Sequence, residues 1–183
     1  IAYWTFDALT GGGSVAADEQ GNYDGAVVGA TVTTGDQGRF GEALSFDGDD
    51  DWVSAGVVAE LVNPASFSTS IWFQRTVDHA GSSLETGHEV NNVLLAHSSG
   101  LSNDSLEIGT EGEFIEIYLD TEELGGLIAP VRVSAGVQSG VWHHLVMTYD
   151  SLSTDEFKIY LDGGLVSTLA DYGGLISDSG VSP

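Results

Sequence analysis

Two loops of this sequence gather the kind of side-chain oxygens that a metal ion needs. One loop spans Asp18–Asp24 and the other Asp47–Asp51, and both contain glycine. Ca²⁺ takes about six to eight oxygen ligands from carboxylates, amides and backbone carbonyls in loops that can bend around it. The alternative is that these side chains form turns on an acidic surface. The sequence contains no EF-hand loop, which would be a more specific sign of Ca²⁺ binding. The predicted metal ligands are Asp18, Asn22, Asp24, Asp47, Asp49 and Asp50.

Four aromatic side chains are candidates for contact with a ligand, because they lie near turns or on strand faces opposite the apolar positions. An aromatic ring bordered by Asp, Asn or Gln side chains forms an apolar platform with a polar rim, which suits a carbohydrate. Alternation looks the same on both sides of a two-sheet sandwich, so core packing is the alternative for Trp4, Trp72 and Trp142. The predicted ligand-binding residues are Trp52, Trp72, Tyr118 and Tyr160.

The chain is strongly acidic. It has 28 Asp and Glu against four Lys and Arg, which gives a formal net charge of −24, and Lys158 is its one lysine. Such a field repels phosphate backbones and anionic membrane surfaces, so we expect no nucleic-acid partner. No window approaches the roughly 20 apolar residues of a membrane span, so we expect no membrane insertion. The sequence begins at Ile1 rather than at a methionine, and we expect it to be part of a larger multidomain chain or assembly.

The stretch Val141–Gly163 has the alternation of an antiparallel hairpin with one buried side. His143 and His144 are adjacent on its first strand and therefore point to opposite faces, so they do not chelate one metal ion together. We expect both histidines to be structural. The side chains that we expect in the core are Leu145, Met147, Tyr149, Phe157, Ile159 and Leu161.

The remaining patterns also predict strands. Residues 1–7 are expected to form a first strand, and residues 43–46 and 51–54 a hairpin joined by Asp47–Asp50. A short helical turn is expected over 57–62 and a long surface loop over 78–92. About ten or more short strands with glycine-rich turns predict an all-β protein, folded as an antiparallel two-sheet β-sandwich of the jelly-roll type.

Several motifs in this order resemble the laminin-G-like, concanavalin A-like group of domains. They are WHHLVMTYD at 142–150 followed by IYLDG at 159–163, AYWTFDA at 2–8 with GNYDG at 21–25, and RFGEALSFDGDDDWV at 39–53 followed by FSTSIWF at 67–73. The resemblance implies one jelly-roll domain over residues 1–183. Its usual closing strand, of the type F-x-G-x-I-D-E-V, is not found, so we expect the domain to lack its C-terminal strand or strands.

The resemblance also implies a function. Members often hold a structural Ca²⁺ with acidic residues after the first strand, and Asp18 and Asn22 occupy the matching positions. Glycosidases of this fold carry paired carboxylates at alternate positions on one strand, but in the stretch Glu113–Asp120 Tyr118 stands between Glu116 and Asp120. The chain is therefore expected not to be an enzyme.

We expect a secreted or cell-surface recognition or adhesion module, stabilised by Ca²⁺, that binds a glycan or a surface or matrix protein. One alternative is a structural spacer in a large surface protein or filament. Another is a divergent glycoside hydrolase. Fold resemblance alone does not separate these functions, because one fold hosts many.

Overall fold

The computed structural model describes residues 1–35, 37–62, 64–78, 90–98, 104–119, 131–153 and 157–170. The chain divides into two compact units, Ile1–Glu60 and Leu61–Pro183. Each unit has its own sheets and its own apolar core. The prediction of a single domain over 1–183 stays a prediction.

Every ladder that the structure describes is antiparallel. Among the described residues the helical element is the 3₁₀ turn η1 (Ala59–Leu61), within the predicted turn at 57–62. The strands are β1 (Leu9–Thr10), β2 (Val15–Ala16), β3 (Gly25–Val28), β4 (Thr31–Val32), β5 (Leu44–Ser45), β6 (Trp52–Ser54), β7 (Ser66–Gln74), β8 (Leu95–Ser98), β9 (Asp104–Glu111), β10 (Phe114–Leu119), β11 (Val131–Ser134), β12 (Trp142–Asp150), β13 (Phe157–Leu161) and β14 (Gly164–Leu169).

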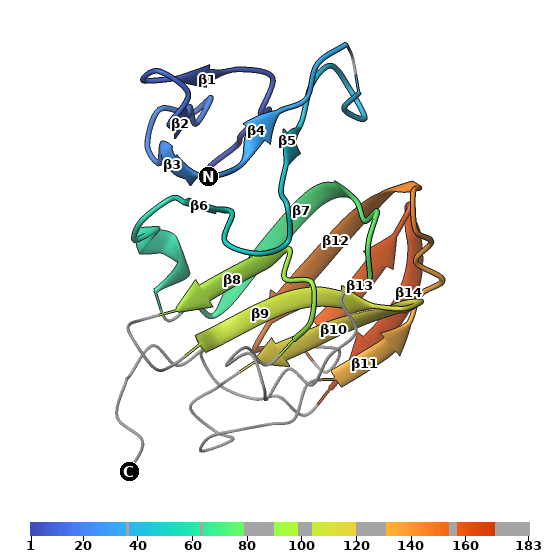
Figure 1. Ribbon diagram of the computed structural model, residues 1–183. Helices are drawn as coiled ribbons and strands as arrows, with labels where there is room; N and C mark the ends of the chain where they lie inside the picture. The colour runs from blue at the N-terminus through green and yellow to red at the C-terminus, as the bar shows by residue number, and fades with distance from the viewer. Residues whose placement is uncertain are drawn as a thin grey trace. The chain divides into compact units, whose positions relative to one another are not determined.

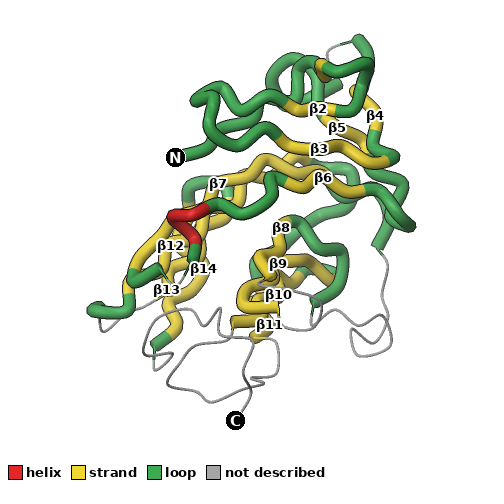
Figure 2. The backbone as a smooth tube through the Cα atoms, turned by 90° about the vertical axis from the view of Figure 1, so that its left-hand side faces the viewer, coloured by secondary structure: helices red, strands yellow, loops and turns green. Residues whose placement is uncertain are grey.

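The second unit is a sandwich of two four-stranded sheets, in the orders β14-β13-β12-β7 and β11-β10-β9-β8. The two layers lie face to face in Figures 1 and 2. Their inward side chains form one core, in which Ile115 and Ile159 are fully buried between the layers. The all-β, antiparallel two-sheet sandwich that the sequence predicts is thereby confirmed.

Strict alternation places the residues of β12 and β13. Along β12 every second residue from His143 to Tyr149 is buried, and the burial pattern of β13 continues the same inward side. All six side chains predicted for the core of the hairpin lie in it. Because side chains alternate between faces along a strand, the residues between them face outward.

The first unit has a smaller core. Its sheet has the order β1-β2-β3-β6, and β4 pairs with β5 in a second sheet. Ala16, Val27 and Ala30 are its buried apolar residues. Trp4 packs against them and donates its indole N–H to the Tyr23 carbonyl at 2.9 Å, so the core alternative is confirmed for this tryptophan.

Two strand predictions in the first unit are wrong. Residues 1–7 form no strand, and Phe6 has a φ of 59°, a left-handed conformation that interrupts an extended chain. The strands β5 and β6 do not pair with each other, because β5 pairs with β4 and β6 with β3. The expected absence of a closing strand concerns residues 171–183, which lie outside the described residues, as does most of the predicted loop 78–92.

Candidate functional site

The outward side of sheet β14-β13-β12-β7, which we call the open face, presents an aromatic pair to solvent. Trp72 of β7 lies opposite His144 of β12. Their rings stack, with centroids 4.7 Å apart and an interplanar angle of 16°. Ser70 Oγ lies 2.9 Å from His144 Nε2, a hydrogen bond that orients the imidazole. Trp72 is 37% exposed, so the stack is accessible from outside.

Polar and apolar rows cross the open face beside this stack. Neighbouring strands lie about 4.8 Å apart, and outward residues of one strand repeat about every 6.8 Å, so the register fixes each row. One row is mixed, with an aromatic ring near its centre, and the next carries three hydroxyls. They consist of Ser70, Val146, Tyr160 and Leu165, and of Ser68, Thr148, Lys158 and Thr168.

Asp162, in the turn after β13, fixes the end of β12 that carries the stack. Its Oδ1 accepts the His144 backbone N–H at 2.9 Å, and its Oδ2 lies 2.8 Å from His143 Nδ1. Burial acts to raise the pKa of Asp162, but the hydrogen bonds from the His144 backbone and the His143 ring outweigh it and hold the pKa below its usual value.

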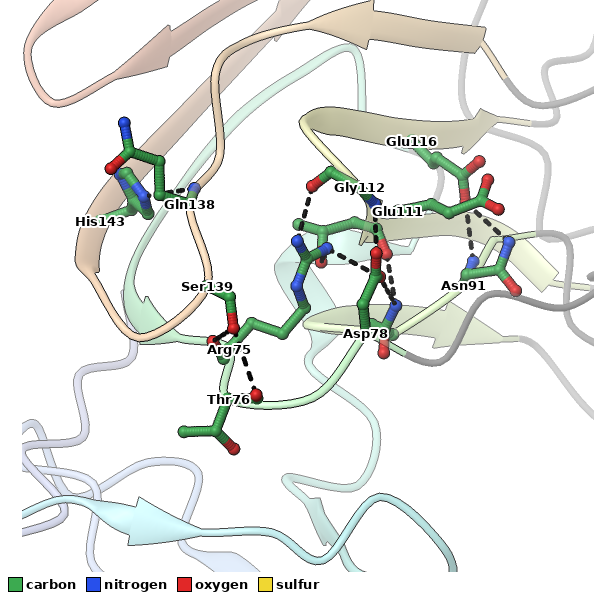
Figure 3. Close-up of polar contacts among 12 residues, drawn as sticks. Arg75, Thr76, Asp78, Asn91, Glu111, Gly112, Glu116, Gln138, Ser139 and His143 are labelled. Atoms are coloured by element: carbon green, nitrogen blue, oxygen red, sulfur yellow. Dashed lines mark hydrogen bonds and ion pairs between the residues drawn. The ribbon is translucent and has the colours of Figure 1, made fainter.

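The two histidines have separate roles. His143 is buried, and its Nε2 accepts the Gln138 backbone N–H at 3.0 Å (Figure 3), so its Nδ1 carries the proton that is donated to Asp162. His144 faces outward on the open face. The prediction that the two rings lie on opposite faces is confirmed, and so is the structural role of His143.

The outward side of sheet β11-β10-β9-β8, which we call the covered face, is built differently. Glu116 is 4% exposed, and its Oε2 accepts the Asn91 backbone N–H at 2.9 Å and the Asn91 amide at 3.1 Å (Figure 3). Glu107 is fully buried and accepts the Val90 N–H at 3.1 Å. The segment Val90–Asn91 passes so close to Gly109 that an added Cβ would lie 2.1 Å from the Asn91 carbonyl oxygen.

Arg75 ties the end of β7 to the turn between β9 and β10. Its Nη1 lies 3.1 Å from Asp78 Oδ1, and its Nη2 donates to the Gly112 carbonyl at 2.6 Å (Figure 3). Asp78 Oδ2 in turn accepts the Gly112 N–H at 2.9 Å. These contacts, like those of Glu116, hold chain segments together, and the carboxylates they use are not free for a substrate.

The Asp18 carboxylate is surrounded by backbone N–H donors, and its role as a metal ligand stays a prediction. It is 4% exposed and accepts four backbone N–H groups, at distances between 2.7 and 3.1 Å. Desolvation acts to raise the pKa of Asp18, but these donors outweigh it and lower the pKa to about 2. Asn22 supplies one donor through its backbone, and Asp24 Oδ1 accepts the Asp18 N–H at 2.9 Å. This loop therefore satisfies its own carboxylates with amide protons.

The second acidic loop fits a hard cation better. Ligand oxygens of Asp47, Asp50 and Asp51 lie within 4.8 Å of one another. Asp49, which the sequence analysis favoured, is not in this group, and Asp51 takes its place. Asp51 Oδ2 accepts the Asp47 N–H at 2.8 Å, which draws the two ends of the loop together. Carboxylate oxygens at such spacing are the donors that Ca²⁺ prefers.

The predicted ligand-binding aromatics separate into three places. Trp72 and Tyr160 share the open face. Tyr118 is 5% exposed on the covered face, and Trp52 is exposed on β6 of the first unit. A cavity lined by Leu61, Pro64, Phe67, His97 and Leu106 has a volume of about 10 Å³, room for about one water molecule, whereas ligand pockets begin at roughly 300 Å³.

Ser70 and His144 are members of this site that were not predicted from the sequence. Alternation indicated that His144 faces outward, but the ring stack depends on the register between β7 and β12. These two strands are neighbours in the sheet but lie far apart in the sequence. The signal that was available is the pair of motifs IWF and WHH, each of which places an aromatic side chain on the same side of its strand.

An antiparallel sandwich of two such sheets is an architecture that concanavalin A-like domains share with several other β-sandwich folds. A family model described as the concanavalin A-like lectin/glucanases superfamily, of laminin G type, matches residues 47–182. The chain belongs to this family. A search of curated proteins finds no match.

Membership carries general properties with it. Laminin G-like domains are typically extracellular, commonly bind glycans or extracellular proteins, and are typically non-catalytic, although the superfamily also includes glycosidases. Among the described residues, no helix has the length and apolar character that crossing a membrane requires.

Proposed function

We propose that this chain is a non-catalytic, extracellular recognition module that binds a glycan on its open face. The observation that carries the proposal is the solvent-exposed stack of Trp72 on His144, oriented by Ser70. A sugar ring has an apolar face, which packs on an aromatic ring, and hydroxyls around its edge, which need polar partners.

The rows beside the stack supply these partners. Ser68, Thr148 and Thr168 place hydroxyls at regular intervals on the outward side. Each hydroxyl can both donate and accept, as a sugar hydroxyl can. The face is open rather than enclosed, which suits a chain-like glycan or the surface of a larger molecule.

The covered face argues against catalysis. A glycosidase needs one carboxylic acid and one carboxylate that both reach the glycosidic bond. Glu107 and Glu116 are buried and occupied by the N–H groups of Val90 and Asn91. Of the other carboxylates in the stretch considered from the sequence, Glu113 accepts the Ser134 hydroxyl at 3.1 Å, and Asp120 lies outside the described residues.

The test is binding to a broad glycan array, followed by titration of each hit with wild type and with two tryptophan variants. Trp72→Ala is expected to weaken binding at least tenfold, which corresponds to about 1.4 kcal/mol. Trp52→Ala removes an equally large exposed ring from the first unit and is expected to leave affinity unchanged. Thermal unfolding of both variants checks that the fold is kept.

Each other outcome has a distinct meaning. Loss of binding in Trp52→Ala but not in Trp72→Ala would move the site to the first unit. Absence of any glycan signal, together with binding of an extracellular protein that Trp72→Ala abolishes, would keep the face and change the ligand. No binding of either kind would favour the structural spacer.

Stabilisation by Ca²⁺ is part of the same proposal. It is supported by the mutual approach of the carboxylates of Asp47, Asp50 and Asp51. These side chains would hold the ion, and its role would be to neutralise three carboxylates and close the loop between β5 and β6. No step of glycan binding depends on it.

A further inference from the structure

The open face differs in charge from the chain that carries it. Among the described strand positions of this face, Asp150 is the one carboxylate and Lys158 the one ammonium group, and Asp162 adds a second carboxylate in the turn at its edge. Asp150 and Lys158 are diagonal neighbours, since Thr148 pairs with Lys158 and Asp150 follows two residues later. Their charges offset each other on a chain whose formal net charge is −24.

The covered face shows that this neutrality is not a general property of the sandwich. Its described outward positions include Glu107, Glu111 and Glu116, and Arg132 is the one basic residue among them. The open face has instead aromatic rings, serines and threonines. A neutral ligand can therefore pack on it without removing a cluster of charges from water, which would be costly.

The net negative charge of the rest of the chain repels anionic ligands. The field of a protein with many uncompensated carboxylates repels anions as they approach. Screening limits this effect to a distance of about 8 Å at physiological salt. An anionic sugar on the open face would gain one ammonium group, Lys158, which Asp150 already offsets.

We infer that the open face selects neutral glycans and discriminates against glycans that carry uronic acids or sulfate groups. This inference rests on the proposed function, because it concerns the same face. It assigns selectivity to the charge pattern of the face, whereas glycan binding itself is assigned to the Trp72–His144 stack.

The experiment compares neutral polysaccharides (glucans, galactans and mannans) with acidic ones (alginate, pectin and heparin) in 0.05 M and 0.5 M NaCl. EDTA is present throughout, so that a cation in the Asp47–Asp51 loop cannot bridge to an acidic sugar. Neutral polysaccharides are expected to bind at least tenfold more tightly than acidic ones at low salt. The affinity for the neutral polysaccharides is expected to change less than twofold between the two salt concentrations.

A gain-of-charge variant tests the cause. Leu165→Lys places one cation beside Tyr160 on the open face, at an exposed position outside the hydroxyl row, where substitutions are usually tolerated. It is expected to raise affinity for the acidic polysaccharides at least threefold. No rise, with the fold intact by thermal unfolding, would overturn the assignment of selectivity to this face.

The outcomes separate the two proposals. Preferred binding of acidic polysaccharides that Trp72→Ala abolishes would overturn the charge inference and leave the proposed function in place. Absence of binding to either class at both salt concentrations would overturn the proposed function and the inference together.

Discussion

The two outer faces of the second unit belong to one sandwich but differ in their polar groups, which are buried and paired on one face and exposed on the other. On the covered face, Glu116 is bonded to Asn91 and Arg132, and its sheet is crossed by another segment of the chain. On the open face, Trp72 and the hydroxyl row remain turned to solvent. Burying a carboxylate costs free energy unless the carboxylate is paired, so the polar groups of the covered face are used to hold the fold together. The exposed side chains of the open face need no such partners and are available for a ligand.

The first prediction concerns close packing on the covered face, and it has the largest expected effect. Gly109→Ala places a Cβ against the Asn91 carbonyl, and overpacking of this kind is expected to cost about 3 kcal/mol of unfolding free energy. The matched control is Gly164→Ala in the other sheet, whose Cβ would meet its nearest neighbour at 3.5 Å. Denaturant unfolding of both variants measures the difference, and equal stabilities would contradict the close approach.

The second prediction extends the comparison to the first unit, where the Asp18 carboxylate accepts four backbone N–H groups and the carboxylates of Asp47 and Asp51 accept one each. Thermal unfolding in high NaCl excludes general screening. Addition of about 1 mM CaCl₂ to a site with a Kd near 10 μM is expected to stabilise by about 2.7 kcal/mol. MgCl₂ serves as the ion control.

A matched pair of variants locates that site. Asp50→Asn is expected to remove the calcium shift and Asp49→Asn to retain it, because Asp49 lies outside the group of close oxygens. A shift that survives Asp50→Asn would place the ion elsewhere, and no shift in wild type would leave these aspartates as solvated turn residues.

The third prediction concerns Asp162, which contacts a histidine on each side of its sheet. Its pKa is lowered in the folded protein, so its contribution is fully present above the unfolded pKa of about 3.9 and is lost as the pH falls toward the folded pKa. Its side chain is 49% exposed, and discounting for solvent leaves an expected loss of about 1 kcal/mol in Asp162→Asn. Asparagine tolerates the φ of 51° at this position.

The measurement is unfolding free energy against pH for wild type and Asp162→Asn. The two curves are expected to converge as the pH falls below the unfolded pKa of about 3.9 toward the lowered pKa of Asp162 in the folded protein. A constant difference over the whole range would mean that the charge of Asp162 contributes nothing to stability.

The fourth prediction has the smallest effect on stability. Ser70→Ala on the open face is expected to change the unfolding free energy by less than about 0.5 kcal/mol, as surface substitutions usually do. It removes the hydrogen bond that orients His144 and is therefore expected to weaken glycan binding severalfold. Stability and affinity measured on the same sample would contradict the comparison if stability fell while affinity was unchanged.

Local alternation predicted the parts of the fold that depend on local pattern. The hairpin of β12 and β13, the strand β7 and the turn near Ala59 follow from neighbouring residues alone. The predictions that failed concern residues whose conformation depends on contacts with residues distant in the sequence. Phe6 leaves the extended conformation beside the small core of the first unit, and β5 and β6 each pair with a strand other than the expected one.

The site was predicted in part for the same reason. Alternation placed Trp72 and Tyr160 outward, but it treated Tyr118 as equivalent, although Tyr118 is buried on the covered face. Which face is covered depends on the path of Val90–Asn91, and no periodic pattern records that path. The scarcity of basic residues was a usable signal, because arginines in so acidic a chain are expected to sit where carboxylates must be paired.

The turn at Asp162–Gly163 also bears on the order in which this unit folds. It joins β13 to β14 with two residues that both have positive φ, as a type I′ turn requires. Such a hairpin forms in about 1–10 μs, whereas the pairing of Ser66 with Asp150 must close a long loop first. In a mutational analysis of the folding transition state, we expect kinetic φ-values near 1 for residues of this turn and low φ-values for residues of β7. The edge strand that carries Trp72 would then be added late, onto a hairpin whose register is already set.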